Sequence, residues 1–221
     1  MSSARLKPYF QLMRIVYLHG FASSPQSSKA RYFAQQFARE KVEFIVPELD
    51  GGDFETLTIT GQLETVAQAM AGRPAVLMGS SLGGYLAAWF ASRNLQVERV
   101  VLLAPAFQFL RRWRERFTPD QLADWRATRK LEIFHYGAGA PRNLGYGFLE
   151  DAANYEDEPD FVQPGLICHG SQDSVVPVSI SQAYAASHPN VDLRLYPTGH
   201  ELTDVLEPMW QETRRFLFQK P

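Results

Sequence analysis

A serine framed by glycines, Ser81 in the run GSSLG at residues 79–83, is the residue of this sequence best placed to act as a nucleophile. The run joins an apolar stretch to a helical pattern, and G-x-S-x-G in that setting is the nucleophile-elbow pattern. The turn is so sharp that the residues two before and two after the serine pass close together. Ser80 is a rival, but only Ser81 has glycine at both of those positions.

A serine hydroxyl is a poor nucleophile at neutral pH and needs a general base beside it. Of the five histidines, His200 lies between the last predicted strand and the last predicted helix. Reactive groups collect beyond the carboxyl ends of parallel strands, so we expect His200 to be the base. His19 and His169 also follow strands, and we expect His169 to brace the turn that carries the acid.

The base needs a carboxylate on its other ring nitrogen, and Asp173 in the loop after the fifth predicted strand is the candidate. The order serine, aspartate, histidine is the one expected of α/β-hydrolases. Four other acidic residues are rivals. Glu201 and Asp204, in the closing helix, stand beside the base, which is a poor position from which to orient it. Asp50 and Asp53 follow the second strand and stay open as alternatives.

The tetrahedral intermediate of such a reaction carries an oxyanion that needs preorganised donors. One donor is expected to be the backbone N–H of Leu82, directly after the nucleophile. The second should come from the loop after the first strand, where Gly20 lets the backbone turn close to the site. The N–H of Phe21 is our candidate for that donor.

Short apolar runs alternate with helical patterns along the chain and would position these groups. Strands are expected at residues 14–18, 43–46, 75–78, 97–104, 166–169 and 192–196, with helices at 27–41, 59–71, 82–93, 178–187 and 201–218. This alternation predicts one α/β domain over residues 1–221, with a mostly parallel sheet of about six strands covered by helices on both faces.

Regularity lapses between residues 107 and 163. Helical stretches are expected at 107–117 and 119–130, followed by a loop rich in glycine that contains Gly137, Gly139, Gly145 and Gly147. We interpret the segment as a small helical, cap-like insertion, since long loops in compact domains are more often functional than idle. An ordinary helix followed by a long surface loop is the alternative.

Aromatic side chains of this segment, first among them Phe107, Phe109 and Trp113, could line an acyl pocket. Alternatively, they pack the insertion onto the body of the protein. Four arginines of the same stretch could attract an anionic leaving group such as a phosphate or CoA moiety, or could form a solvated helix face. They are Arg111, Arg112, Arg114 and Arg116.

The composition is that of an ordinary globular protein, with 45% hydrophobic residues, 21% charged residues and a net charge of −2 over 221 residues. Neither a nucleic-acid nor a membrane partner is expected. Met1 to Met13 lack the apolar core of a signal peptide, so the cytoplasm is the expected location.

Cys168 is the only cysteine and should be a buried, inert thiol. No metal-ligand spacing is present, and no cofactor is expected. The oligomeric state stays open.

Two segments, LHGFASSPQSSKA at residues 18–30 and GSSLGGYLAAW at residues 79–89, resemble the small YqiA-like esterases of the α/β-hydrolase superfamily. The resemblance extends from residue 14 to about residue 218. It implies intracellular hydrolysis of short acyl esters, with Ser81, Asp173 and His200 as the triad. It also implies a reduced fold that lacks the first antiparallel strands of larger members, although residues 10–13 could extend the sheet.

The sequence therefore predicts a serine hydrolase that cleaves small-molecule carboxylic esters through an acyl-enzyme. The same triad would serve a thioesterase, an amidase or a C–C hydrolase, because the pocket decides the bond. A non-catalytic binding protein on a hydrolase scaffold is the alternative from another class.

Overall fold

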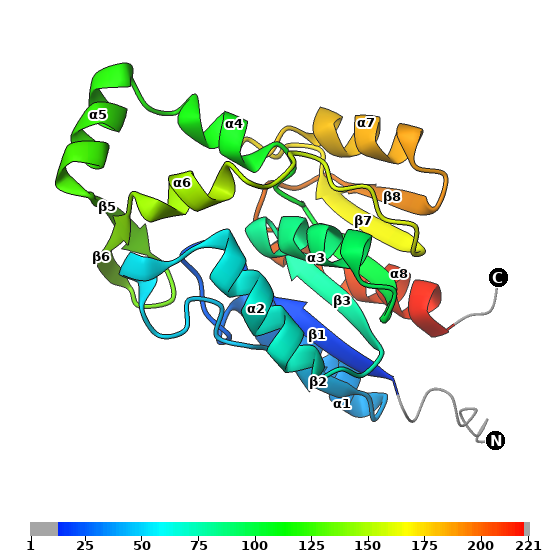
Figure 1. Cartoon of the computed structure of the whole chain (residues 1–221). Helices are drawn as coiled ribbons and strands as arrows, with labels where there is room; N and C mark the ends of the chain where they lie inside the picture. The colour runs from blue at the N-terminus through cyan, green and yellow to red at the C-terminus, as the bar shows by residue number, and fades with distance from the viewer. Residues whose placement is uncertain (1–12, 219–221) are drawn as a thin grey trace, which may run out of the picture.

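A six-stranded sheet in which every strand pair is parallel forms the centre of the computed structural model, which describes residues 13–218 (Figure 1). The strand order is β2-β1-β3-β4-β7-β8. The strands are β1 (Arg14–Leu18), β2 (Glu43–Ile45), β3 (Ala75–Ser80), β4 (Val97–Leu103), β7 (Gly165–Gly170) and β8 (Val191–Tyr196). This confirms the predicted sheet. Of the extension predicted at residues 10–13, residues 10–12 lie outside the described residues, and Met13 is not part of a strand.

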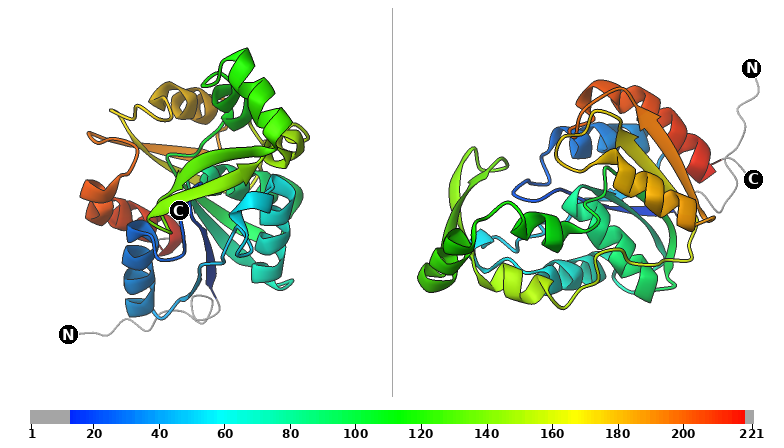
Figure 2. Two further views of the ribbon diagram at one scale, coloured as in Figure 1. Left: turned by 90° about the vertical axis from the view of Figure 1, so that its left-hand side faces the viewer. Right: turned by 90° about the horizontal axis from the view of Figure 1, so that it is seen from above.

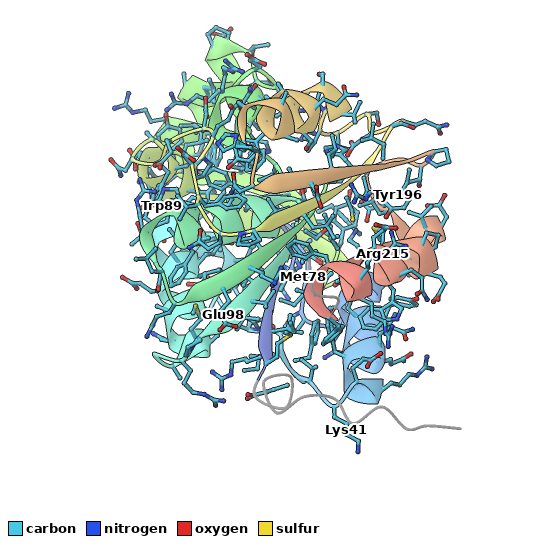
Figure 3. All side chains as sticks on the ribbon, turned by 90° about the vertical axis from the view of Figure 1, so that its right-hand side faces the viewer. Lys41, Met78, Trp89, Glu98, Tyr196 and Arg215 are labelled. Atoms are coloured by element: carbon cyan, nitrogen blue, oxygen red, sulfur yellow. The ribbon has the colours of Figure 1, made fainter. Side chains whose placement is uncertain are left out.

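Helices cover both faces of the sheet. Since successive strand residues point to opposite sides, each strand contributes side chains to the cores on both faces. In β1, Ile15 and Tyr17 belong to the core beneath α1 (Ser28–Arg39) and α8 (Leu206–Phe218). Val16 and Leu18 belong to the core beneath α2 (Ile59–Met70), α3 (Leu82–Arg93) and α7 (Val178–Ser187). Figure 3 shows Met78 of β3 and Tyr196 of β8, which belong to the α1 and α8 side.

The closing helix begins later than the sequence pattern suggests. A short 3₁₀ turn, η3 (Thr203–Val205), precedes α8, so residues 201–205 are not α-helical. Leu202 has a φ of 56°, which the α-helix does not allow. Pro208 then stands in the first turn of α8, where its missing N–H would have no intrahelical acceptor. The residues just after His200 are therefore a tight loop rather than the start of a helix.

The segment between β4 and β7 contains α4 (Phe109–Arg114), α5 (Pro119–Thr128), β5 (Lys130–His135), β6 (Ala140–Gly145) and α6 (Gly147–Ala152). We call residues 107–163 the insertion. The prediction of a glycine-rich loop in this segment was wrong in one respect, because part of it folds into β5 and β6, which pair as an antiparallel hairpin. Figures 1 and 2 show the insertion at the end of the sheet toward which the strand arrows point.

Local sequence explains how α5 and the hairpin arise. Thr118 and Gln121 form a capping box at the start of α5, with Pro119 as the first helical residue. At the hairpin turn, Gly139 takes a φ of 64°, which glycine adopts without strain. Within residues 13–218, no helix is long and apolar enough to cross a membrane.

Candidate active site

Ser81 occupies a strained turn between β3 and α3. Its backbone angles, φ 54° and ψ −117°, lie outside the regions that residues with a Cβ ordinarily adopt. A Cβ added to Gly79 would lie 2.1 Å from the carbonyl oxygen of Gly83, and one added to Gly83 would lie 2.1 Å from that of Leu18. Both flanking residues must therefore be glycine, as the elbow pattern requires.

The structure brings the three predicted residues into one hydrogen-bonded chain. Ser81 Oγ lies 3.0 Å from His200 Nε2, and His200 Nδ1 lies 2.7 Å from Asp173 Oδ2. Since an ionised carboxylate only accepts, Nδ1 carries the proton and Nε2 is free to accept the Ser81 hydroxyl. The three residues come from loops after β3, β8 and β7, all at the carboxyl edge of the sheet.

Asp173 is fixed as an anion by its surroundings. Its Oδ1 accepts hydrogen bonds from the backbone N–H groups of Val175 at 2.8 Å and Val176 at 2.7 Å. Burial by itself raises the pKa of the carboxyl group, but the contacts with His169 and His200 and the N–H of Val176 outweigh burial and hold that pKa well below its usual value. The carboxylate therefore stays charged at neutral pH.

None of the four rival acids takes this place. Asp50 accepts a hydrogen bond from the N–H of Gly52, and Asp53 caps the short helix η2 (Phe54–Thr56). The other two are held by Thr198, which donates to Asp204, and by Lys29, whose Nζ lies 3.5 Å from a Glu201 carboxylate oxygen.

Lys29 is a neighbour of the site that the sequence pattern did not identify. Its Nζ donates to the backbone carbonyl of Glu201, the residue after His200, at 2.6 Å. Burial lowers the pKa of this ammonium group, and the Glu201 carboxylate opposes that shift. The contact joins α1 to the histidine loop across 172 positions, a separation that no local pattern reveals.

Within the described residues, His200 is the only histidine in hydrogen-bond contact with Ser81 Oγ, and the other four have partners of their own. His19 Nδ1 bonds the carbonyl of Gly20 at 3.0 Å, and His135 Nδ1 accepts the N–H of Ala138 at 3.0 Å. Burial lowers the pKa of both rings. His188 stacks on a tyrosine ring at the end of α7. His169 contacts Asp173, so it does brace the acid turn.

The loop after β1 (residues 19–27), which we call the oxyanion loop for the role predicted for it, lies against Ser81. A Cβ built on Gly20 would lie 3.6 Å from Ser81 Cβ. Among residues 13–218, the N–H groups of Phe21 and Leu82 have no hydrogen-bond acceptor. Neither predicted donor is therefore used by an acceptor within this part of the protein itself.

An aromatic cluster surrounds the side chain of Phe21. Its ring centroid lies 5.3 Å from that of Trp113, 5.5 Å from Phe54 and 5.6 Å from Phe148. Phe109 stacks on Trp113 with centroids 5.6 Å apart. The aromatics thus pack the insertion onto the oxyanion loop, the alternative that the sequence left open, while remaining next to the site.

Phe107 and the basic cluster lie differently. Phe107 is fully buried and stacks on Tyr184 of α7 at 4.3 Å, so the structure does not bring it together with the other two aromatics. Of the four arginines, Arg112 is only partly exposed and donates to the carbonyl of Val175 in the acid loop. The other three are exposed.

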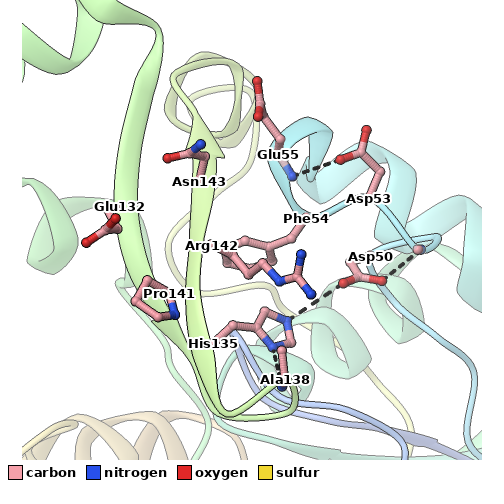
Figure 4. A pocket seen from close by; sticks show the side chains of 11 residues that line it. Asp50, Asp53, Phe54, Glu55, Glu132, His135, Ala138, Pro141, Arg142 and Asn143 are labelled. Carbon is pink, nitrogen blue, oxygen red and sulfur yellow. Dashed lines mark hydrogen bonds and ion pairs between the residues drawn. The ribbon is translucent and has the colours of Figure 1, made fainter.

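A cavity of about 430 Å³ lies between the hairpin and the loop after β2 (Figure 4). Its lining includes Asp50, Phe54, His135 and Arg142, but not Ser81. A smaller cavity shares three of these residues and is also lined by Phe21 of the oxyanion loop. Within the described part of the chain, no group of three or more His, Cys, Asp or Glu side chains could hold a metal ion.

Comparison with known proteins identifies a family and a fold. The model of the uncharacterised protein family UPF0227 matches residues 14–216, which confirms the resemblance to YqiA-like proteins. A protein from Agrobacterium vitis S4, provisionally named a hydrolase, is 24% identical with a TM-score of 0.79, over 93% of this chain and 88% of that one.

Two further solved structures share the fold. The α/β-hydrolase domain-containing protein 10 from mouse is 20% identical with a TM-score of 0.72, over 91% of this chain and 90% of that one. Est1E from Butyrivibrio proteoclasticus, solved with ferulic acid bound, is 19% identical with a TM-score of 0.73, over 90% and 88% of the two chains. These similarities establish the α/β-hydrolase fold.

Proposed function

Since this chain belongs to the protein family UPF0227 and has the α/β-hydrolase fold, we propose that it is a serine hydrolase that cleaves carboxylic esters through an acyl-enzyme. The observation that carries the proposal is the chain of contacts from Ser81 Oγ through His200 to Asp173, at 3.0 and 2.7 Å. Nucleophile, base and orienting acid stand at the separations that nucleophilic catalysis needs.

In the first half-reaction, Ser81 Oγ attacks the ester carbonyl while His200 Nε2 takes the hydroxyl proton. The carbonyl oxygen becomes an oxyanion that the N–H groups of Phe21 and Leu82 would stabilise. Collapse of the tetrahedral intermediate breaks the carbon–oxygen bond of the ester, and His200 gives its proton to the leaving alcohol. The products of this step are the free alcohol and the acyl-Ser81 ester.

In the second half-reaction, His200 takes a proton from water, and the resulting hydroxide attacks the acyl-Ser81 carbonyl. The second tetrahedral intermediate releases Ser81, which recovers its proton from His200, and the carboxylic acid leaves. The anionic Asp173 stabilises the positive charge that His200 acquires in both halves. The pKa of the Asp173 carboxyl group is held well below its usual value, so Asp173 stays ionised at neutral pH.

The cluster around Phe21 suggests where the acyl chain would lie. Phe109 is partly exposed and Trp113 is 7% exposed, and both belong to the aromatic group beside the oxyanion loop. A short aliphatic or aromatic acyl chain is the substrate that such a wall favours. Phe107 is not part of this proposed acyl surface, because it is fully buried and its ring stacks on Tyr184 of α7.

A panel of p-nitrophenyl esters of graded acyl length, a hydroxycinnamoyl ester and matched thioesters would test the proposal. Ser81→Ala serves as the blank, because it removes the nucleophile and leaves the other groups in place. We expect hydrolysis of short esters by the wild type and a loss of at least about 10³-fold in the variant. Undiminished turnover by Ser81→Ala would refute the proposal, whereas preference for the thioesters would change only the bond.

A further inference from the structure

A second imidazole contacts the carboxylate that orients the candidate base. His169 Nε2 lies 3.1 Å from Asp173 Oδ2, the same oxygen that His200 Nδ1 approaches at 2.7 Å. The side chains of His169 and Asp173 are both 0% exposed. Nothing in the hydrolytic steps above uses His169, yet it stands one contact away from the base.

The ring of His169 is held at both nitrogens. Nε2 donates to the carbonyl of Val176 at 3.0 Å and also faces Asp173, so one N–H serves two oxygens. Nε2 is therefore the nitrogen that carries the proton, and Nδ1 accepts from the hydroxyl of Ser181 at 2.8 Å. Ser181 is fully buried in α7. The ring thus ties the end of β7 to the acid loop and to a helix.

The acid loop needs such an anchor. Val175 at its tip is 48% exposed, and the loop carries the only carboxylate that touches His200 within the described residues. His169 restrains this loop twice, through the carbonyl of Val176 and through the carboxylate of Asp173. The N–H of Val176 in turn donates to Asp173 Oδ1, so the anchored peptide also fixes the second carboxylate oxygen.

We propose that His169 is a positioning residue that acts through Asp173 to set the orientation and the basicity of the His200–Asp173 pair. This inference rests on the proposed function, because it assigns a role within that triad. Without the N–H of His169, the charge of Asp173 would be less neutralised, and Asp173 would hold the proton of His200 more strongly. Without the contact of His169 with the acid loop, the Asp173 carboxylate could rotate away from His200. His169 opposes both changes.

Two other charged groups act on Asp173 and must be held constant in a test. Lys29 from α1 and Arg112 from α4 both interact electrostatically with the Asp173 carboxylate. Neither residue is altered in the variants below. Arg112 also donates to the carbonyl of Val175, so it supports the exposed tip of the loop. The buried side of the loop is the part that depends on His169.

The test compares His169→Leu with His169→Gln in the full chain, using the best ester of the panel. Leucine removes both polar contacts, whereas the glutamine amide can donate from near the position of Nε2. We expect His169→Leu to lower kcat about 10- to 100-fold with little change in KM, and to move the acid limb of the kcat/KM profile to higher pH. His169→Gln should restore most of the rate and the original profile.

Ser181→Ala is a milder variant that frees Nδ1 without emptying the site, and it decides the matter where His169→Leu does not fold. It should reduce kcat a few-fold and shift the acid limb in the same direction. In an Asp173→Asn background, adding His169→Leu should have no further effect on kcat, because the residue through which His169 acts is already changed. Thermal melts of every variant record whether the fold persists.

Two results would overturn the inference. One is a folded His169→Leu or Ser181→Ala variant with an unchanged pH profile, and the other is a loss of kcat by His169→Leu that persists undiminished beside Asp173→Asn. Either would show that His169 only fills the core. Failure of the proposed function is distinguishable, because Ser81→Ala would then keep the activity of the wild type whatever happens at residue 169.

Discussion

Replacing Ser81 with glycine should stabilise the protein relative to replacing it with alanine, the reverse of the usual order. The backbone of Ser81 has φ 54° and ψ −117°, a conformation in which a Cβ is strained. Alanine keeps the Cβ and glycine removes it. Both substitutions delete the hydroxyl and its contact with His200, so the difference between them isolates the backbone.

The magnitude follows from two opposing terms. Strained backbone conformations of this kind cost about 1–3 kcal/mol, and glycine recovers that amount. Glycine also gives the unfolded chain more freedom, which costs about 0.4–1 kcal/mol. The net expectation is that Ser81→Gly has a free energy of unfolding about 1–2 kcal/mol above that of Ser81→Ala. In a chain of 221 residues this corresponds to a Tm about 2–8 °C higher.

Urea unfolding of the two variants measures this difference directly. Ser92 in α3 supplies the matched control, because it is a helical serine whose hydroxyl bonds the carbonyl of Trp89. There the usual order should hold, with Ser92→Gly about 1 kcal/mol less stable than Ser92→Ala. A Ser81→Gly variant no more stable than Ser81→Ala would refute the strain at the elbow.

Three further expectations concern the surroundings of the site. Gly137→Val should lower kcat about 10- to 100-fold, because a Cβ at the hairpin turn would lie 2.7 Å from the Ser24 side chain and displace the oxyanion loop. Gly147→Ala is the control: its Cβ meets nothing within 4 Å, so it should leave kcat unchanged in the same assay. Burial raises the pKa of the Cys168 thiol to about 12, so a thiol reagent at pH 8 should label it only after unfolding; fast labelling of the native protein would contradict this. The pKa of Asp173 is lower in the folded than in the unfolded protein, so the stability that this carboxylate contributes is present above about pH 4 and is lost as the pH falls further. In urea unfolding, the difference in free energy of unfolding between the wild type and Asp173→Asn should therefore shrink below about pH 4. A difference that does not change with pH would contradict this prediction.

The elements that position the site could be predicted from the sequence because their signals are local. The glycines around Ser81 record a steric requirement of a single turn, and the structure shows the two Cβ positions that would collide. Each of the other predicted groups follows an apolar strand, so a parallel sheet gathers them at one edge. The hydrogen bonds from His200 to Ser81 and Asp173 are the outcome of that rule.

The hairpin was missed because its two strands carry weak and conflicting signals. Leu131 and Ile133 alternate with more exposed residues in β5, which is a strand pattern, but the segment follows directly on α5 and reads as its continuation. In β6, Pro141 cannot donate to a ladder, and proline ordinarily argues against a strand. The pairing is therefore established by contacts across the hairpin, which no single run of residues displays.

Contacts between distant segments were equally out of reach. Lys29 on the carbonyl of Glu201 and His169 on Asp173 arise only when the sheet brings the loops together. The position of His169, four residues before the acid, does suggest a brace, but the hydroxyl of Ser181 that completes its environment comes from a separate helix. Sequence patterns locate the candidate catalytic groups better than the residues that hold them in place.

Treatment of the native protein with a fluorophosphonate probe, followed by mass spectrometry of the digested chain, tests the central claim most directly. An activated serine beside a base and two free N–H donors should form a covalent phosphonyl adduct within minutes. We predict one adduct per chain, on Ser81, that is absent in Ser81→Ala and strongly slowed in His200→Ala. A native protein that remains unlabelled, or one labelled at Ser80 instead, would contradict the account.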